Sequence, residues 1–170
     1  MSYATTNPFT GEVVKTFPNA TDTEVAQTLD KAQAAFEAWK NTAIAERVKV
    51  LQKAADLLRK SHTEYAKILT LEMGKVIGEA EGEVELSAQI LEYYVENAEK
   101  LLAPDKLPSK HPSYTESWVE HEPQGILLAI EPWNFPYYQI VRIAAPQLAA
   151  GNVLILKHAS NVPQCAAAFE

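Results

Sequence analysis

Two short apolar runs near the C-terminal end of the chain constrain its fold more than any other feature. Residues 126–130 and 153–156 consist only of Ile, Leu, Val and Ala, so neither run has a polar face. Such strands are typical of a parallel sheet that is covered on both sides. Residues 137–148, between the two runs, have the length and apolar content of a helix. The pattern predicts a strand, a helix and a second parallel strand, the start of a doubly wound α/β domain.

Polar residues follow each of the two expected strands. Residues 131–134 read Glu-Pro-Trp-Asn, and residues 157–160 read Lys-His-Ala-Ser. Ligands of doubly wound sheets bind beyond the carboxyl ends of the strands, so we expect a binding site at these two segments. The dinucleotide fingerprint G-x-G-x-x-G is absent from the 6 glycines of the chain, which disfavours an ordinary Rossmann dehydrogenase.

The first hundred residues follow a helical period behind a short β entry. Residues 5–8 and 12–17 flank a turn-like segment and predict a hairpin. Thr21 is followed three residues later by Glu24, which is the signature of a capping box. Apolar residues then recur at helical spacing in four successive stretches, so we predict four amphipathic helices. The repeat is carried by Val25, Leu29, Ala32, Phe36 and Trp39; by Ile44, Val48, Leu51, Ala55 and Leu58; by Tyr65, Ile68 and Leu69; and by Ile77, Ala80, Val84, Leu91, Tyr94, Ala98 and Leu101.

Glycines and acidic residues are interleaved at the start of the last expected helix. Gly74, Gly78 and Gly82 stand four apart, which favours close packing or a helix start. The glutamates of residues 79–85 alternate along the chain, and carboxylates two apart on a helix point to different faces. We expect this acidic run to form a solvated face and not a cation site.

A proline-rich segment divides the chain into two unlike halves. Residues 103–113 contain Pro104, Pro108 and Pro112, so they are expected neither to form a helix nor to join a central strand. Beyond this linker, residues 116–122 alternate in polarity and predict a strand.

The composition excludes several kinds of partner and suggests a compartment. The 170 residues include 15 Lys and Arg against 22 Asp and Glu, a net charge of −7 that repels phosphate backbones and anionic membranes. We therefore expect no nucleic-acid and no membrane partner, and no stretch approaches the roughly 20 apolar residues of a spanning helix. The N-terminus does not resemble a signal peptide, and a single cysteine cannot form an internal disulfide, so we expect a reducing cytoplasm.

The segment between the two strands carries a family resemblance. Residues 132–136 read Pro-Trp-Asn-Phe-Pro and resemble the PWNFP motif of the NAD(P)-dependent aldehyde dehydrogenase superfamily; the match extends through Gly151 and Asn152 to Lys157. Three further segments are similar to the N-terminal region of that family: residues 7–12, 71–75 and 121–125. The family also lacks the glycine fingerprint in its first βαβ unit. Within it, the Lys-His pair that begins at Lys157 is most similar to the bacterial succinate-semialdehyde branch.

The resemblance implies a fold, a domain layout and an assembly. Residues 1–113 would form an N-terminal hairpin and the helical part of the cofactor-binding domain, and residues 126–170 would begin a Rossmann-like NAD(P)-binding sheet. Residues 114–125 would form a bridging strand region that extends a sheet toward a partner subunit, as in a homodimer or homotetramer. The nucleophilic cysteine, the glutamate base and the catalytic domain of the family have no counterpart in these residues.

Asn134 is the catalytic candidate that the resemblance implies. Thiol attack on an aldehyde builds an alkoxide that needs a preorganised donor, and the side-chain amide of Asn134 would be that donor. The alternative is an Asn that only serves a turn between two prolines. By the same resemblance Ile130, Pro132 and Trp133 would line the cofactor groove, although Ile130 and Trp133 could equally belong to the core.

Lys157 and Ser160 are the expected cofactor contacts at the second strand. A cation at the end of a buried strand needs a partner, and the matching family lysine binds the adenosine ribose. NAD-preferring members commonly carry Glu where this chain has Ser160, and that Glu would repel a 2′-phosphate. The cofactor is therefore expected to be NADP or NAD, with NADP slightly favoured.

Arg142 is the substrate candidate. It lies on an otherwise apolar helix, so a paired anion is expected, either a structural one such as Glu131 or the distal carboxylate of succinic semialdehyde. The next residue, Ile143, departs from the Lys that is common in the wider family.

His158 stands without a second metal ligand and receives no role, and Cys165 is expected to be a buried thiol and not the nucleophile.

The expected function is the oxidation of an aldehyde to a carboxylate with NAD(P) in a full-length enzyme, and the expected substrate is succinic semialdehyde, which would be oxidised to succinate. Two alternatives stay open. One is a non-catalytic cofactor-binding or oligomerisation module that ends near residue 170, and the other is an acylating dehydrogenase that uses coenzyme A.

Overall fold

The computed structural model describes residues 3–108 and 113–170. The chain enters through an antiparallel hairpin of β1 (Tyr3–Thr6) and β2 (Val13–Phe17), as the sequence predicted. The turn closes with the N–H of Gly11 donating to the carbonyl of Asn7 at 2.8 Å. Gly11 has a φ of 74°, a left-handed value that glycine adopts without steric cost.

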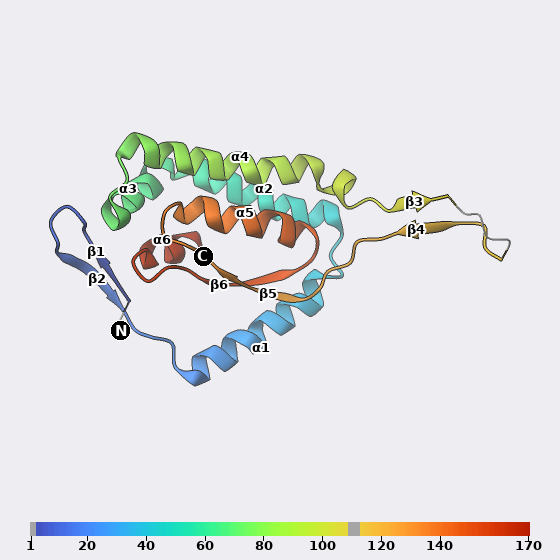
Figure 1. Ribbon diagram of the computed structural model, residues 1–170, viewed down its shortest axis with the longest axis horizontal. Helices are drawn as coiled ribbons and strands as arrows, with labels where there is room; N and C mark the ends of the chain where they lie inside the picture. The colour runs from blue at the N-terminus through green and yellow to red at the C-terminus, as the bar shows by residue number, and fades with distance from the viewer. Residues whose placement is uncertain (1–2, 109–112) are drawn as a thin grey trace.

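Four helices follow the hairpin, and this prediction is confirmed: α1 (Asp22–Trp39), α2 (Ile44–Lys60), α3 (His62–Met73) and α4 (Ile77–Leu101). The capping box at the start of α1 is present, because the Thr21 hydroxyl accepts from the N–H of Glu24 and the Glu24 carboxylate accepts from the N–H of Thr21. The α2 and α4 helices pack side by side and form one layer of the body, seen at the top of Figure 1.

The α/β unit lies beneath this helical layer. It runs through β5 (Ile126–Ile130), α5 (Pro136–Ala149), β6 (Val153–Lys157) and α6 (Pro163–Phe169). The two strands pair in parallel and in register from Ile126↔Val153 to Ile130↔Lys157, which confirms the predicted βαβ unit. Figure 1 shows α5 between the α2–α4 layer and the strands, with α1 on the opposite side of the strands.

The core joins the helices to the α/β unit. Its largest fully buried side chains belong to α2, α3, α4 and α5, and they include Leu51, Leu69, Leu91, Val84, Tyr137 and Val141. The indole N–H of Trp39 also donates to the carbonyl of Leu148 at 2.9 Å and ties the end of α1 to the end of α5.

The first strand of the unit is not buried on both faces as predicted. Ala129 is 2% exposed, whereas Leu128 and Ile130 are 62% and 68% exposed. Within the described residues the sheet contains only β5 and β6, and α1 packs mainly against β6. One face of β5 is therefore left largely uncovered.

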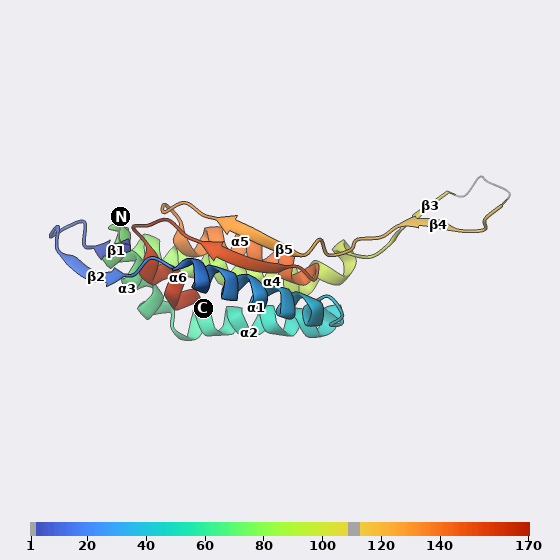
Figure 2. The same ribbon diagram turned by 90° about the horizontal axis from the view of Figure 1, so that it is seen from below.

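A narrow β ribbon projects from the body. Its strands, β3 (Asp105–Leu107) and β4 (Ser117–Val119), pair antiparallel, and Figures 1 and 2 show the ribbon extending away from the helices. The β3 strand spans the three residues between Pro104 and Pro108 of the proline-rich linker. It belongs to an isolated two-stranded ribbon, where flanking prolines are tolerated, so the expectation that this segment forms no helix and joins no central strand is confirmed for its described residues. The linker prediction for residues 109–112 lies outside the described residues, and β4 is shorter than the predicted 116–122.

The glycine series does not pack as a unit. Gly74 ends α3 with a φ of +78°, and a Cβ there would lie 2.9 Å from Cγ of Pro8. A Cβ at Gly78 or Gly82 would meet no atom within 4 Å, so close packing was wrong for both. Gly78 instead lies at the start of α4.

No described helix is both long and apolar enough to cross a bilayer.

Candidate functional site

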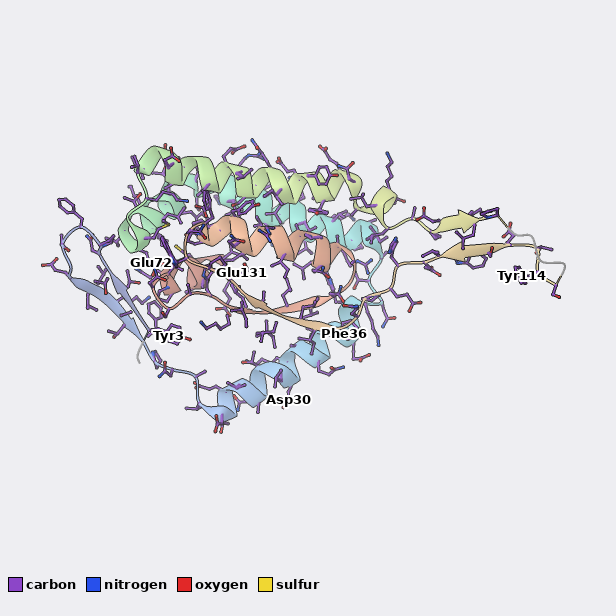
Figure 3. All side chains as sticks on the ribbon, viewed as in Figure 1. Tyr3, Asp30, Phe36, Glu72, Tyr114 and Glu131 are labelled. Atoms are coloured by element: carbon purple, nitrogen blue, oxygen red, sulfur yellow. The ribbon has the colours of Figure 1, made fainter. Side chains whose placement is uncertain are left out.

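The carboxyl ends of β5 and β6 bring the two predicted polar segments together. Ile130 and Lys157 are partners in the strand register, and the N–H of Glu131 donates to the carbonyl of Lys157 at 3.1 Å. Residues 131–134 and 157–160 therefore leave the sheet at the same edge. In Figure 3 the labelled Glu131 marks this edge, at the end of the molecule that also holds Glu72 and Tyr3.

His158 connects the two segments. Its ring is buried, with Nε2 3.0 Å from the carbonyl oxygen of Pro136 and Nδ1 accepting from the N–H of Ala159 at 2.8 Å. Both contacts are satisfied by the tautomer that carries its proton on Nε2. The sequence assigned His158 no role, and the structure shows it bridging the loop after β6 to the first residue of α5.

Asn134 is exposed between the end of β5 and the start of α5. Its side chain makes no hydrogen bond to any described residue, so it forms no turn-stabilising bond of the kind that the alternative interpretation requires. Pro132 is exposed beside it, and Ile130 and Trp133 are 68% and 51% exposed, which excludes the core alternative for these two residues in this structure. The edge thus presents a free amide next to an exposed apolar surface.

Lys157 and Ser160 are both exposed on the neighbouring segment. The Lys157 ammonium lies 5.9 Å from the centroid of the Tyr3 ring, and it pairs with no carboxylate among the described residues. The cation was expected at the end of a buried strand, but the side chain reaches solvent. It is therefore free to bind a polar or anionic group.

Arg142 lies on α5, and the structural anion expected for it is absent from the described residues. No carboxylate there lies within salt-bridge distance of its guanidinium, and its side chain is exposed. Burial raises the pKa of Glu131 above its usual range, while the charge of Arg142 acts on it in the opposite direction. The charge of Arg142 therefore affects the pKa of Glu131, although the two side chains form no salt bridge.

Glu83 is a site-forming residue that the sequence interpretation missed. Its side chain is 0% exposed, and its Oε1 accepts from the N–H groups of Tyr137 at 2.9 Å and Tyr138 at 3.3 Å, at the start of α5. Its other oxygen pairs with Lys75. The expectation of a solvated acidic face was wrong here, because Glu83 lies beside Val84 on the apolar stripe of α4. Helical spacing from Ala80 was the signal that could have identified it.

Glu72 performs the equivalent task for α6. Its carboxylate is buried and accepts from the N–H groups of Gln164 at 2.7 Å and Cys165 at 2.8 Å, and also from the Thr5 hydroxyl. Burial and the nearby Glu72 raise the pKa of the Cys165 thiol well above its usual range. Cys165 is fully buried, which confirms the prediction of a buried thiol.

Comparison with known proteins settles the family. The model of the aldehyde dehydrogenase family matches residues 1–170. The chain belongs to the aldehyde dehydrogenase family. This confirms the family resemblance that was based on the Pro-Trp-Asn-Phe-Pro segment.

Among curated aldehyde dehydrogenases, the chain is 45% identical over 168 residues to a succinate-semialdehyde dehydrogenase [NADP(+)] of Deinococcus radiodurans, covering 99% of this chain and 35% of that protein. It is 46% identical over 166 residues to succinate-semialdehyde dehydrogenase [NADP(+)] 1 of Mycobacterium tuberculosis, covering 98% of this chain and 36% of that protein. The chain thus spans about a third of the length of these relatives.

A solved aldehyde dehydrogenase shares the fold of these residues. The succinic semialdehyde dehydrogenase of Streptococcus pyogenes, in complex with NADP+, superimposes with a TM-score of 0.93 at 40% identity, over 98% of this chain and 36% of that one. The N-terminal part of the aldehyde dehydrogenase fold is therefore present in this chain, with its mixture of helices and small sheets.

Proposed function

We propose that these residues belong to an NAD(P)-dependent dehydrogenase that oxidises succinic semialdehyde to succinate. The observation that carries the proposal is the free side-chain amide of Asn134 at the edge where β5 and β6 end. The family membership and the succinate-semialdehyde dehydrogenases among the relatives support it. Because the chain spans about a third of those relatives, the activity is proposed for the complete protein that carries these residues.

The chemistry assigned to this chain is stabilisation of charge. An aldehyde attacked by a thiolate develops an alkoxide, and the amide of Asn134 would donate to that oxygen without attacking the aldehyde itself, as an amine would. The thiolate would not come from Cys165, whose thiol is fully buried and whose pKa is raised. It must come from elsewhere in the complete protein.

Lys157 and Ser160 would hold the cofactor, with Ile130, Pro132 and Trp133 as its apolar wall. The exposed ammonium and hydroxyl suit a phosphorylated ribose, and residues 157–160 contain no carboxylate that would repel a 2′-phosphate. NADP is therefore proposed over NAD, and the NADP(+)-linked relatives support that choice. When bound, NADP would accept the hydride, while this chain orients it at the strand ends.

Arg142 would bind the distal carboxylate of the substrate. An exposed guanidinium with no carboxylate partner among the described residues can form a bidentate pair with the one carboxylate of succinic semialdehyde.

The single free cysteine supports a reducing cytoplasm as the proposed compartment.

The decisive experiment is an assay of the complete protein with succinic semialdehyde and NADP, beside an Asn134→Ala variant. Loss of one oxyanion donor should lower kcat by about 10²–10³-fold, with little change in the Kd for NADP. Undiminished turnover of the variant would contradict the role of Asn134. Transfer of the acyl group to coenzyme A instead of water would replace the proposed reaction by the acylating one.

A further inference from the structure

The segment between α3 and α4 directs a lysine toward the loop that carries Asn134. Gly74 ends α3 in the left-handed conformation, and Pro8 of the hairpin turn leaves no room there for a Cβ. The chain turns at this point, and the Lys75 side chain is only 10% exposed. Its ammonium contacts two groups, the carboxylate of Glu83 and the ring of Phe135.

The first contact neutralises a carboxylate that is wholly removed from water. Glu83 is surrounded by three donors, which are the Lys75 ammonium and the N–H groups of Tyr137 and Tyr138. The first helical turn of α5 offers unpaired N–H groups and a partial positive charge, both of which favour an anion. Phe135, the N-cap residue of α5, has no side chain that could provide this cap. Glu83 from α4 therefore fixes the start of α5.

The second contact holds the residue that follows Asn134. The Lys75 ammonium lies 3.7 Å from the centroid of the Phe135 ring, and the ring also packs edge-to-face against Tyr138 at 5.9 Å. A cation this close to an aromatic face is attracted by the ring quadrupole. Phe135 thus contacts both Lys75 and the first turn of the helix that Glu83 caps.

We propose that Lys75 and Glu83 are positioning residues for the Asn134 amide, a role that rests on the proposed function above. The Asn134 side chain makes no hydrogen bond of its own to a described residue, so its position depends on its neighbours in the chain. The strand end fixes the loop before it, and the Lys75–Glu83 pair fixes the loop after it. The pair acts through Phe135 and the start of α5, and it touches neither substrate nor cofactor.

Glu72 supplies a matched control. It is also a buried carboxylate that caps a helix of the same α/β unit, but its helix, α6, follows the 157–160 segment and not Asn134. It pairs with no lysine and contacts no ring of the Asn134 loop among the described residues. Glu72→Gln should therefore report the general cost of disturbing a buried helix cap.

The test is a double-mutant cycle in the complete protein, read as the single-turnover rate of NADPH formation with saturating succinic semialdehyde. Lys75→Met should lower this rate about tenfold in the native background and less than about twofold in the Asn134→Ala background. Lys75→Arg, which keeps the charge, should restore most of the rate. The Kd for NADP should stay within about twofold of the native value throughout. Glu72→Gln should have the same proportional effect in both backgrounds.

The outcomes separate this inference from the proposed function. If Asn134→Ala is slow but Lys75→Met slows both backgrounds equally, the positioning role is wrong and the oxyanion role stands. If Asn134→Ala itself keeps the native rate, the proposed function fails first. Should Lys75→Met not fold, Phe135→Leu replaces it in the same cycle, because Phe135 is 41% exposed and the substitution removes the ring that contacts Lys75 and Tyr138 while it leaves the hydrogen bonds of Glu83 in place.

Discussion

At the residue scale, Ser160 and Lys157 are exposed residues of the same short segment, and under the proposed function they would determine which cofactor is accepted. Lys157 contributes a cation without a carboxylate partner among the described residues, and Ser160 contributes a hydroxyl. A 2′-phosphate placed between them would meet positive charge and hydrogen-bond donors only. A carboxylate at position 160 would reverse that balance and would accept from ribose hydroxyls instead.

Ser160→Glu should therefore change cofactor preference. We expect the ratio of kcat/KM with NADP to kcat/KM with NAD to fall about tenfold or more. The reason is that the new carboxylate at position 160 would lie close to the negatively charged 2′-phosphate of NADP. Steady-state kinetics with both cofactors measure the ratio, and Ser160→Gln is the control of similar size without charge. An unchanged ratio in Ser160→Glu would show that this position does not discriminate between the cofactors.

Some residues of the site could be predicted from the sequence, and others could not. Asn134 stands in a recognisable motif between two prolines, so its place at a strand end followed from local pattern alone. Glu83 and Glu72 bind backbone N–H groups 54 and 92 residues away, and no local pattern specifies such partners. A buried Glu on an amphipathic helix can still be suspected when it falls on the apolar stripe, as Glu83 does.

At the scale of elements, α5 connects the site to the core. It begins with Pro136, buries Tyr137 and Val141 against the helical layer, and exposes Arg142. The helix, its parallel strands and the four N-terminal helices were predictable, because the N-terminal helices repeat apolar residues at helical spacing and the strands are short uninterrupted apolar runs on either side of α5. The exposure of β5 and the short strand β3 were not, since both depend on which strands lie beside them in space and not on the residues themselves.

Arg142→Ala on α5 should separate charged from uncharged substrates. Loss of a bidentate pair with the distal carboxylate should lower kcat/KM for succinic semialdehyde about 10–100-fold, and kcat/KM for butyraldehyde much less. Comparing the two substrates in the same preparation is the measurement. If both values fell by the same factor, Arg142 would not recognise the carboxylate.

At the scale of the whole molecule, the ribbon of β3 and β4 projects from the body, and its two described strands contact mainly each other. Leu107, Trp118 and Val119 are each about half exposed, at 48%, 52% and 47%. Apolar side chains on a projecting two-stranded ribbon favour pairing with another chain. A homodimer or homotetramer built through this ribbon remains our proposal for the complete protein.

Trp118→Glu should weaken that assembly. The mass measured by light scattering during size-exclusion chromatography should drop to that of a smaller oligomer or a monomer, because the substitution places a charge where an apolar contact is proposed. Val50→Glu, at a residue of α2 that is similarly exposed at 51%, is the control. A native protein that is already monomeric would refute the proposal, as would an unchanged mass for Trp118→Glu.

The buried ring of His158 links the loop that carries Asn134 to the 157–160 segment. One imidazole accepts from the loop after β6 and donates to the carbonyl of Pro136, two residues after Asn134. If the proposed cofactor displaced the 157–160 loop, the hydrogen bond from His158 to Pro136 would transmit that displacement toward Asn134. Linkage makes the effect reciprocal, so each ligand should alter the affinity of the other by the same factor. The binding of the proposed cofactor and of the aldehyde would then be coupled through one buried imidazole, whichever of the two binds first.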